Sequence, residues 1–210
     1  MTYDPTRTAL LLVDPYNDFL SEGGKVWPRA KAIAEEVKLL DHLRAIVRVA
    51  RQKGIKIYFV PHHRWEPGDY VHWHHATPYQ LASAERQTFA KGTWGGEFHP
   101  DFQPQSGDIV VHEHWGSSGF ANTDLDQQLK QFGIGRVILI GMIANTCIEA
   151  TGRFAMELGY HVTLVKDATA AFSREGMQAF AINAATYAHV VTTTDDLISA
   201  LSGQAKPAAA

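Results

Sequence analysis

Short, almost wholly apolar runs alternate along the chain with longer segments in which apolar residues recur at helical spacing. The apolar runs predict buried strands over residues 8–13, 56–60, 108–111, 136–140, 161–165 and 189–192. The segments between them predict helices over residues 30–52, 78–89, 123–132, 146–158, 173–187 and 194–201. Strands that are apolar throughout and separated by helices specify a parallel sheet that is buried on both faces. We therefore predict an α/β fold with a six-stranded, mostly parallel sheet and helices on both faces.

One region, residues 61–107, breaks this alternation and is rich in Pro, Gly, His and Trp. A connection of that length in a compact domain is usually a functional loop or a lid with short helices of its own. Nothing in the 210-residue chain suggests a second core, so we expect a single domain over residues 1–202. The small, polar stretch 203–210 is expected to be a disordered tail.

Composition places the chain among globular proteins. Hydrophobic residues make up 45% and charged residues 20% of it, and the formal net charge is only -3. That balance gives no basic surface for nucleic acid or anionic lipid, and the apolar runs are too short to span a bilayer. The single cysteine cannot form an internal disulfide, and the first residues lack the order of a secretory signal. We expect a cytoplasmic protein that binds neither nucleic acid nor membrane.

The residues that follow each predicted strand are candidates for a site, because ligands of an open parallel sheet bind beyond the carboxyl ends of its strands. Cys147 lies at the start of the helix after the fourth strand. Free backbone N–H groups and the helix dipole at such a position lower a thiol pKa and can bind an oxyanion. A buried structural cysteine is the alternative interpretation, and position alone leaves both open.

Two polar features after other strands, and the absence of one glycine motif, qualify this picture. Asp14 follows the first strand and could act as the general base for the thiol, or could cap the loop that begins at Pro15. His112 and His114 follow the third strand, but no third ligand stands at a diagnostic spacing, so we predict no metal. No G-x-G-x-x-G stretch follows a strand and opens a helix, which argues against a dinucleotide. We expect a site without a cofactor.

Three motifs stand in a fixed order along the chain: LLLVD with the nearby Asn17, Asp18 and Phe19; the stretch from Gly107 to Phe120 with Thr123, Asp124 and Leu125; and GMIANTCIEAT at residues 141–151. Together they resemble the isochorismatase-like cysteine hydrolase family, over about residues 8–201. The resemblance implies a Rossmann-type three-layer fold, assembly as a homodimer or homotetramer, and a site built from Asp, Lys and Cys. Members hydrolyse amides, ureido compounds and, in isochorismatases proper, a vinyl ether.

Carried onto this sequence, the resemblance gives Asp14 as the catalytic aspartate and Cys147 as the nucleophile. Backbone N–H groups of Ile143, Ala144 and Cys147 would hold the oxyanion, and a cis peptide bond would join Ile143 to Ala144. The family's catalytic lysine is the departure, because alignment of the third strand places Glu113 there. We hypothesise that Glu113 either shares a proton with Asp14 or is neutralised by His112, His114 or a loop residue.

The predicted activity is cleavage of an amide or ureido C–N bond of a small molecule, with Cys147 forming an acyl-enzyme. The side chains expected to contact the substrate are Phe19, Trp115, Phe120 and His63. Residues 61–67 lack the Asp-x-His order of nicotinamidase-type members, which argues against the metal site of those members. Two alternatives remain open: ether or ester hydrolysis of the isochorismatase type, and a non-catalytic protein that has lost the lysine.

Overall fold

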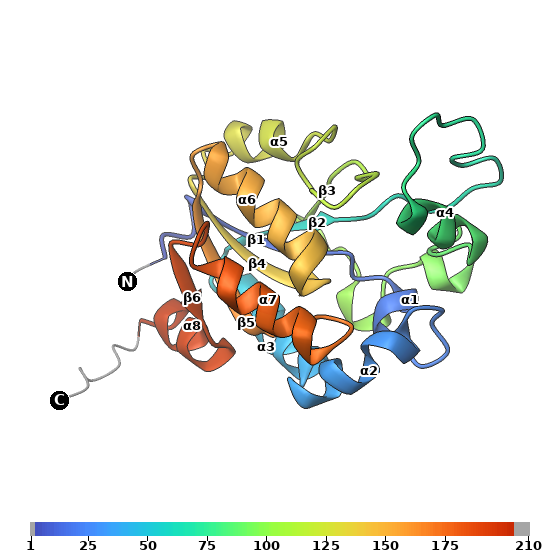
Figure 1. The fold of residues 1–210 in the computed structure, drawn as a ribbon. Helices are drawn as coiled ribbons and strands as arrows, with labels where there is room; N and C mark the ends of the chain where they lie inside the picture. The colour runs from blue at the N-terminus through green and yellow to red at the C-terminus, as the bar shows by residue number, and fades with distance from the viewer. Residues whose placement is uncertain (1–2, 204–210) are drawn as a thin grey trace.

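A parallel sheet of six strands forms the centre of the computed structural model, which describes residues 3–203 (Figure 1). The strands are β1 (Thr8–Val13), β2 (Lys56–Val60), β3 (Ile109–Val110), β4 (Arg136–Met142), β5 (His161–Ala170) and β6 (Val190–Thr192). Their order is β3-β2-β1-β4-β5-β6, and all neighbours pair in parallel. The predicted fold class is confirmed. The predicted tail, residues 203–210, lies outside the described residues except for its first residue.

The central strands lie in the middle of the sheet because their sequences are almost wholly apolar. All six residues of β1 are buried, and β1 pairs with β2 on one side and with β4 on the other. Each fully buried Leu or Val side chain contributes about 1.5–3 kcal/mol of hydrophobic stabilisation. β3 lies at the edge of the sheet, has only two residues and leaves Val110 exposed. The apolar pattern therefore decides which strands lie in the middle.

Helices cover both faces of the sheet (Figure 1). α3 (Leu39–Gln52) packs against α8 (Thr194–Leu201) on one face, and α6 (Glu149–Glu157) packs against α7 (Arg174–Ala184) on the other. The remaining helical elements are α1 (Asn17–Leu20), α2 (Trp27–Glu36), α4 (Pro78–Glu85), α5 (Leu125–Gln131), the 3₁₀ turns η1 (Trp94–Gly96) and η2 (Pro100–Phe102), and a π-helical turn η3 (Ala144–Ile148).

Two elements differ from the sequence prediction. The helix expected over residues 30–52 is two helices, α2 and α3, because Lys38 between them has a left-handed backbone with φ 53°. The fifth strand, expected to end at residue 165, continues through a register irregularity to Ala170. Lys166 is exposed and Asp167 half-buried, so these polar residues ended the apolar pattern before the strand itself ends.

The strand order places the site between β1 and β4. The chain continues from β1 toward β2 and β3 on one side and from β4 toward β5 and β6 on the other, so these two neighbours form the switch point of the sheet, where ligands bind. Gly141 in β4 has φ 117° and lies so close to the Val13 carbonyl oxygen that a Cβ atom would collide with it. A glycine here lets the end of β4 lie against the end of β1.

The long segment 61–107 carries α4, which stands beyond the carboxyl ends of the strands (Figure 1). α4 lies within the helix predicted over residues 78–89, and it begins with a capping box in which Gln80 N–H donates to Thr77 Oγ1 at 3.2 Å. None of the helices within residues 3–203 combines the length and the apolar character needed to cross a membrane.

Candidate active site

Asp14, His114 and Cys147 form a buried group at the carboxyl ends of the strands. Asp14 follows β1, Cys147 lies in η3 directly after β4, and His114 follows the edge strand β3. One ligand-type atom of each residue lies within 4.8 Å of those of the other two. The exposed fractions of the three residues are 0%, 0% and 6%. Residues 33 to 133 positions apart in sequence therefore meet in one place because the parallel strands all end there.

Asp14 occupies a left-handed backbone position with φ 52°, which few residue types other than Gly, Asn and Asp adopt readily. Its Oδ1 lies 3.1 Å from His114 Nε2. Its Oδ2 is buried and has no hydrogen-bond partner among residues 3–203. This second oxygen is therefore free to accept the proton of the Cys147 thiol.

His114 lies between two hydrogen-bond acceptors. Its Nδ1 is 2.8 Å from the Gly116 carbonyl oxygen, and its Nε2 faces the Asp14 carboxylate. An imidazole ring that donates to both must carry both protons, and is then positively charged. Burial disfavours that charge, but the Asp14 charge and hydrogen bond outweigh it, so the pKa of His114 is raised above its ordinary value. Sequence reasoning noted His114 after the third strand but gave the catalytic position to Glu113.

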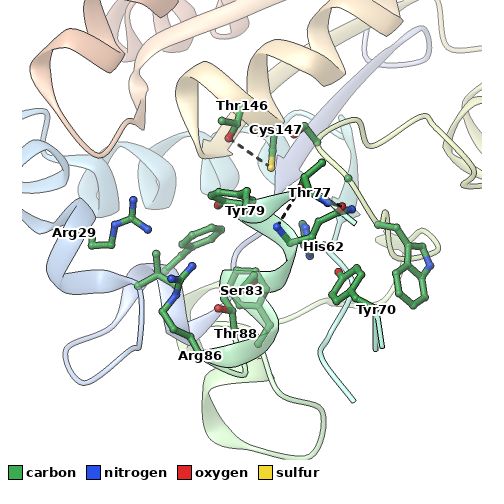
Figure 2. A pocket seen from close by; sticks show the side chains of 17 residues that line it. Arg29, His62, Tyr70, Thr77, Tyr79, Ser83, Arg86, Thr88, Thr146 and Cys147 are labelled. Carbon is green, nitrogen blue, oxygen red and sulfur yellow. Dashed lines mark hydrogen bonds between the residues drawn. The ribbon is translucent and has the colours of Figure 1, made fainter. Parts of the chain in front are cut away.

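Cys147 rests as a protonated thiol. Burial and the negative charge of Asp14 raise its pKa well above the ordinary value, against smaller opposite effects of the Thr146 hydroxyl and the Ile143 backbone N–H. The Thr146 Oγ1 atom lies 3.8 Å from the sulfur (Figure 2). Formation of the thiolate therefore requires a base, and Asp14 is the base within reach.

The expected oxyanion segment precedes Cys147 and is buried. The cis peptide bond joins Met142 to Ile143, one residue earlier than the predicted Ile143–Ala144 bond. Ile143 and Ala144 are 1% and 0% exposed. The assignment of the backbone N–H groups of Ile143, Ala144 and Cys147 to an oxyanion stays a prediction.

Glu113 points away from this group, so its predicted place beside Asp14 is wrong. Its carboxylate accepts hydrogen bonds from Arg64 Nε at 2.6 Å and from the Arg64 backbone N–H at 3.0 Å, and lies 3.3 Å from His63 Nδ1. Burial would raise the pKa of Glu113, but His63 and Arg64 lower it to about 2. Of the alternatives in the hypothesis, the loop residue holds, because Arg64 neutralises the carboxylate. The histidine beside it is His63, not the expected His112 or His114.

There is a simple geometric reason why the side chain of His114, and not that of Glu113, lies beside Asp14. The chain beyond β2 and β3 stays extended and paired, with a parallel bridge between His62 and His114. The Pro61 carbonyl accepts from His114 N–H at 2.9 Å, and the His114 carbonyl accepts from His63 N–H at 2.9 Å. Successive side chains in extended chain point to opposite sides, so a shift of one residue exchanges the two faces.

A cavity of about 290 Å³ opens onto Cys147 (Figure 2). Of the predicted substrate contacts, Phe19 and Trp115 line it, whereas His63 and Phe120 are not among its lining residues. His63 stacks behind Trp115 with ring centroids 3.5 Å apart, and so supports the wall instead of forming it. Phe120 is buried and packs against Tyr160 at 5.8 Å. The prediction of these last two contacts is therefore corrected.

The cavity also has walls that were not among the predicted substrate contacts. α4 contributes Tyr79, and the extension of β2 contributes His62 (Figure 2). Burial, together with the nearby charge of His114, lowers the pKa of His62 to about 4, so this ring is neutral at neutral pH. His62 Nδ1 is 2.9 Å from the His63 carbonyl oxygen and so carries its proton. Its other nitrogen, Nε2, is then an acceptor.

Asp14, His114 and Cys147 are also the one set of His, Cys, Asp and Glu side chains within residues 3–203 close enough to share a metal ion. Their atom types would suit zinc. The 3.1 Å separation of His114 Nε2 and Asp14 Oδ1 is that of a direct hydrogen bond between the two residues. The expectation of a site without a metal stays a prediction.

Known proteins resemble the chain over almost its full length. The family model described as Isochorismatase domain matches residues 8–196. The ureidoacrylate amidohydrolase RutB of Agrobacterium fabrum is 30% identical over 220 residues, covering 99% of this chain and 95% of the relative. The protein of the same name from Caulobacter segnis is 30% identical over 205 residues, covering 92% of this chain and 85% of the relative.

Solved structures share the fold. A cysteine hydrolase from Pseudomonas syringae pv. phaseolicola has a TM-score of 0.81 and 25% identity, covering 98% of this chain and 97% of the other. N-carbamoylsarcosine amidase from Thermoplasma acidophilum has a TM-score of 0.66 and 27% identity, covering 90% of this chain and 97% of the other. On the match of the family model and on these relatives, the chain belongs to the isochorismatase family of hydrolases.

Proposed function

We propose that this protein hydrolyses an amide or ureido C–N bond of a small molecule, with Cys147 as the nucleophile. The observation that carries the proposal is the buried group of Asp14, His114 and Cys147 beside a cavity of small-molecule size. Two similar proteins are a ureidoacrylate amidohydrolase and an N-carbamoylsarcosine amidase, and their activities support a ureido or carbamoyl group as the reacting part of the substrate.

In the first half of the reaction, the thiol proton passes to Asp14 Oδ2 as the sulfur of Cys147 attacks the substrate carbonyl carbon. The carbonyl oxygen gains the electron pair, and backbone N–H groups of the segment before Cys147 stabilise its charge. The C–N bond then breaks, and the departing amine takes the proton that Asp14 received. An acyl or carbamoyl group remains on the sulfur as a thioester.

In the second half, Asp14 takes a proton from a water molecule, which attacks the thioester carbonyl. The carbon–sulfur bond breaks, and the proton held by Asp14 returns to the sulfur. The products are the amine and the acid or carbamate, one water molecule is consumed, and the thiol is regenerated.

His114 takes the part that a positively charged lysine plays in the family. Its Nε2 lies 3.1 Å from Asp14 Oδ1, so the protonated ring donates to that oxygen, leaves Oδ2 for the thiol and gives the carboxylate a counter-charge. The same positive charge stabilises the negative sulfur at the moment of attack. An imidazolium loses its proton at a lower pH than a lysine ammonium, so this enzyme depends on pH where a lysine-containing relative does not.

Turnover of a panel of ureido acids, carbamoyl amino acids, simple amides and isochorismate tests the proposal, with wild type and Cys147→Ala compared. We expect Cys147→Ala to lower kcat at least about 1,000-fold. Intact-protein mass spectrometry of wild type, acid-quenched during turnover, should show an acyl or carbamoyl adduct on the peptide that contains Cys147. Activity should survive dialysis against EDTA. Full activity of Cys147→Ala, or turnover of the ether substrate alone, contradicts the proposal.

We also propose that the enzyme works in the cytoplasm as a homodimer or homotetramer. A single free cysteine supports a reducing compartment. Apolar side chains around α4, namely Val71, Trp73 and Leu81, are 69%, 47% and 50% exposed, as is typical of a surface that another chain covers. Light scattering coupled to size-exclusion chromatography measures the mass in solution, and a monomer at micromolar concentration would contradict the assembly.

A further inference from the structure

We propose that Arg29 and Arg86 form an anion subsite that binds a carboxylate of the substrate, in the same cavity as Cys147. The inference rests on the proposed function, because it gives that hydrolase a substrate with a reacting carbonyl at one end and a carboxylate at the other. Arg29 comes from α2 and Arg86 from the end of α4, so two separate elements supply the two guanidinium groups.

The cavity lining carries positive charge only. Arg29 and Arg86 are its charged side chains, and no Asp or Glu of residues 3–203 lines it. His62, the lining histidine, is neutral at neutral pH because its pKa is lowered to about 4. Asp14 lies nearby, but its charge is offset by His114. The field in the cavity therefore favours an anionic molecule over a neutral or cationic one.

Neither arginine is committed to a carboxylate of the protein. Five other arginines form ion pairs with Asp or Glu: Arg44, Arg51, Arg64, Arg153 and Arg174. Within residues 3–203, Arg86 has no such pair, and the Arg29 guanidinium lies over the Phe172 ring, 4.2 Å from its centroid. A guanidinium stacked on a ring keeps its N–H groups free in the plane, where they can bind a carboxylate through two parallel hydrogen bonds.

Hydroxyl groups accompany the two arginines. Ser83 and Thr88 also line the cavity, and Figure 2 shows both near Arg86 and away from Cys147. Thr88 is 6% exposed, and its Oγ1 is buried without a hydrogen-bond partner in the described residues. Buried hydroxyl groups are nearly always paired, so an unpaired one on a cavity wall indicates a missing partner. A carboxylate oxygen held by the arginines supplies that partner.

Tyr79 lies between the two ends of the cavity. Figure 2 shows its ring below Cys147, with Arg29 and Arg86 beyond it. The Tyr79 residue is 53% exposed, but partial burial around its hydroxyl raises the pKa of that group. Cys147 and Asp14 act on this pKa in the same direction, and Arg29 and Arg86 act in the opposite direction. This hydroxyl is therefore within electrostatic range of both the nucleophile and the arginines. Cys147, Arg29 and Arg86 all line one cavity of about 290 Å³, which is the size of a small-molecule site.

The substrate class that fits is a ureido acid or an N-carbamoyl amino acid. Such a molecule presents its ureido carbonyl to Cys147 and its carboxylate to Arg29 and Arg86. A neutral amide of the same size lacks the second contact and leaves the two cations without a counter-charge. The arginines therefore select substrates by charge and take no part in the bond-breaking step.

Kinetics with a matched pair of substrates, ureidoacrylate and its methyl ester, test the subsite. We expect Arg29→Gln and Arg86→Gln each to raise KM for the acid about 10- to 100-fold, with kcat little changed and KM for the ester unchanged. Arg86→Lys, which keeps the charge and loses the paired geometry, should fall between wild type and Arg86→Gln. Arg48→Gln is the control, because Arg48 is also exposed but lies on α3 outside the cavity.

Binding of the acid to Cys147→Ala, measured by calorimetry, separates the subsite from catalysis. The subsite is supported if Arg29→Gln or Arg86→Gln in this background weakens binding of the acid and leaves binding of the ester unchanged. It is overturned if acid and ester respond equally, or if neither responds. If wild type turns over no ureido compound while the acid still binds in an arginine-dependent way, the proposed function fails and the subsite stands.

Discussion

The substitution His114→Gln removes the positive charge beside Asp14 and leaves a buried carboxylate. Both side chains are 0% exposed, and the two atoms lie 3.1 Å apart. At an effective dielectric constant of about 20, two unit charges ~4 Å apart attract by about 4 kcal/mol. Loss of one partner of a buried pair costs a similar ~3–5 kcal/mol. At about 2–4 °C per kcal/mol for a chain of this size, we expect Tm to fall by about 6–20 °C.

The difference between wild type and this variant depends on pH with a defined sign. Burial lowers the pKa of His114, but Asp14 outweighs it and raises that pKa above the ordinary 6.5. A folded-state pKa above the unfolded value contributes stability that is fully present below about pH 6.5 and is lost as the pH rises through the folded value. We expect both the gap in Tm and the wild-type activity to decrease toward alkaline pH, as the imidazolium loses its proton.

Thermal melts from pH 6 to pH 10, followed by near-ultraviolet circular dichroism, measure the gap. His112→Gln is the matched control, because this histidine lies in the same segment with its side chain 79% exposed. Asp14→Asn combined with His114→Gln leaves two neutral groups and should recover at least about half of the lost Tm, although it stays inactive. The reasoning is refuted if His114→Gln and His112→Gln have the same Tm at pH 6, or if the difference in Tm between His114→Gln and wild type does not depend on pH.

Three further predictions follow from the contacts of single residues. Because burial and Asp14 raise the pKa of Cys147, iodoacetamide should alkylate the enzyme more slowly at pH 7 than it alkylates free cysteine, and faster as the pH rises; rapid labelling at pH 7 would contradict this. Glu113→Gln should leave kcat within about twofold and lower stability by about 1–2 kcal/mol through its lost Arg64 contacts. Since the pKa of Glu113 is lowered to about 2, its contribution is present above about pH 4.5 and lost as the pH falls toward 2, which acid melts of this variant and wild type measure. Gly141→Ala should yield little folded protein, measured by soluble expression, because its Cβ would meet the Val13 carbonyl; a normal yield would show that the strand ends can separate.

The sequence by itself determined the sheet and two members of the site. An unbroken apolar run such as residues 8–13 is shielded from water on both sides only in a sheet that helices cover on both faces. Every predicted strand was found. Because parallel strands all end at one edge, Asp14 and Cys147 could be placed together from their positions after strands alone. The weak points of the prediction were local. Nothing in the sequence around Lys38 marked the break between α2 and α3, since neither Gly nor Pro stands there.

Only the tertiary structure decided which neighbour of a pair enters the site. Glu113 and His114 are adjacent, and the face that each takes depends on how the extended chain after β3 pairs with that after β2. That pairing is a contact between residues about 50 positions apart, which no local pattern encodes. In the same way, the tertiary structure decides that His62 lines the cavity and His63 does not. It also brings Arg29 of α2 and Arg86 at the end of α4 to one cavity. Local sequence fixes periodicity and burial, whereas the direction of a side chain at the end of a strand is set by the partner that the fold supplies.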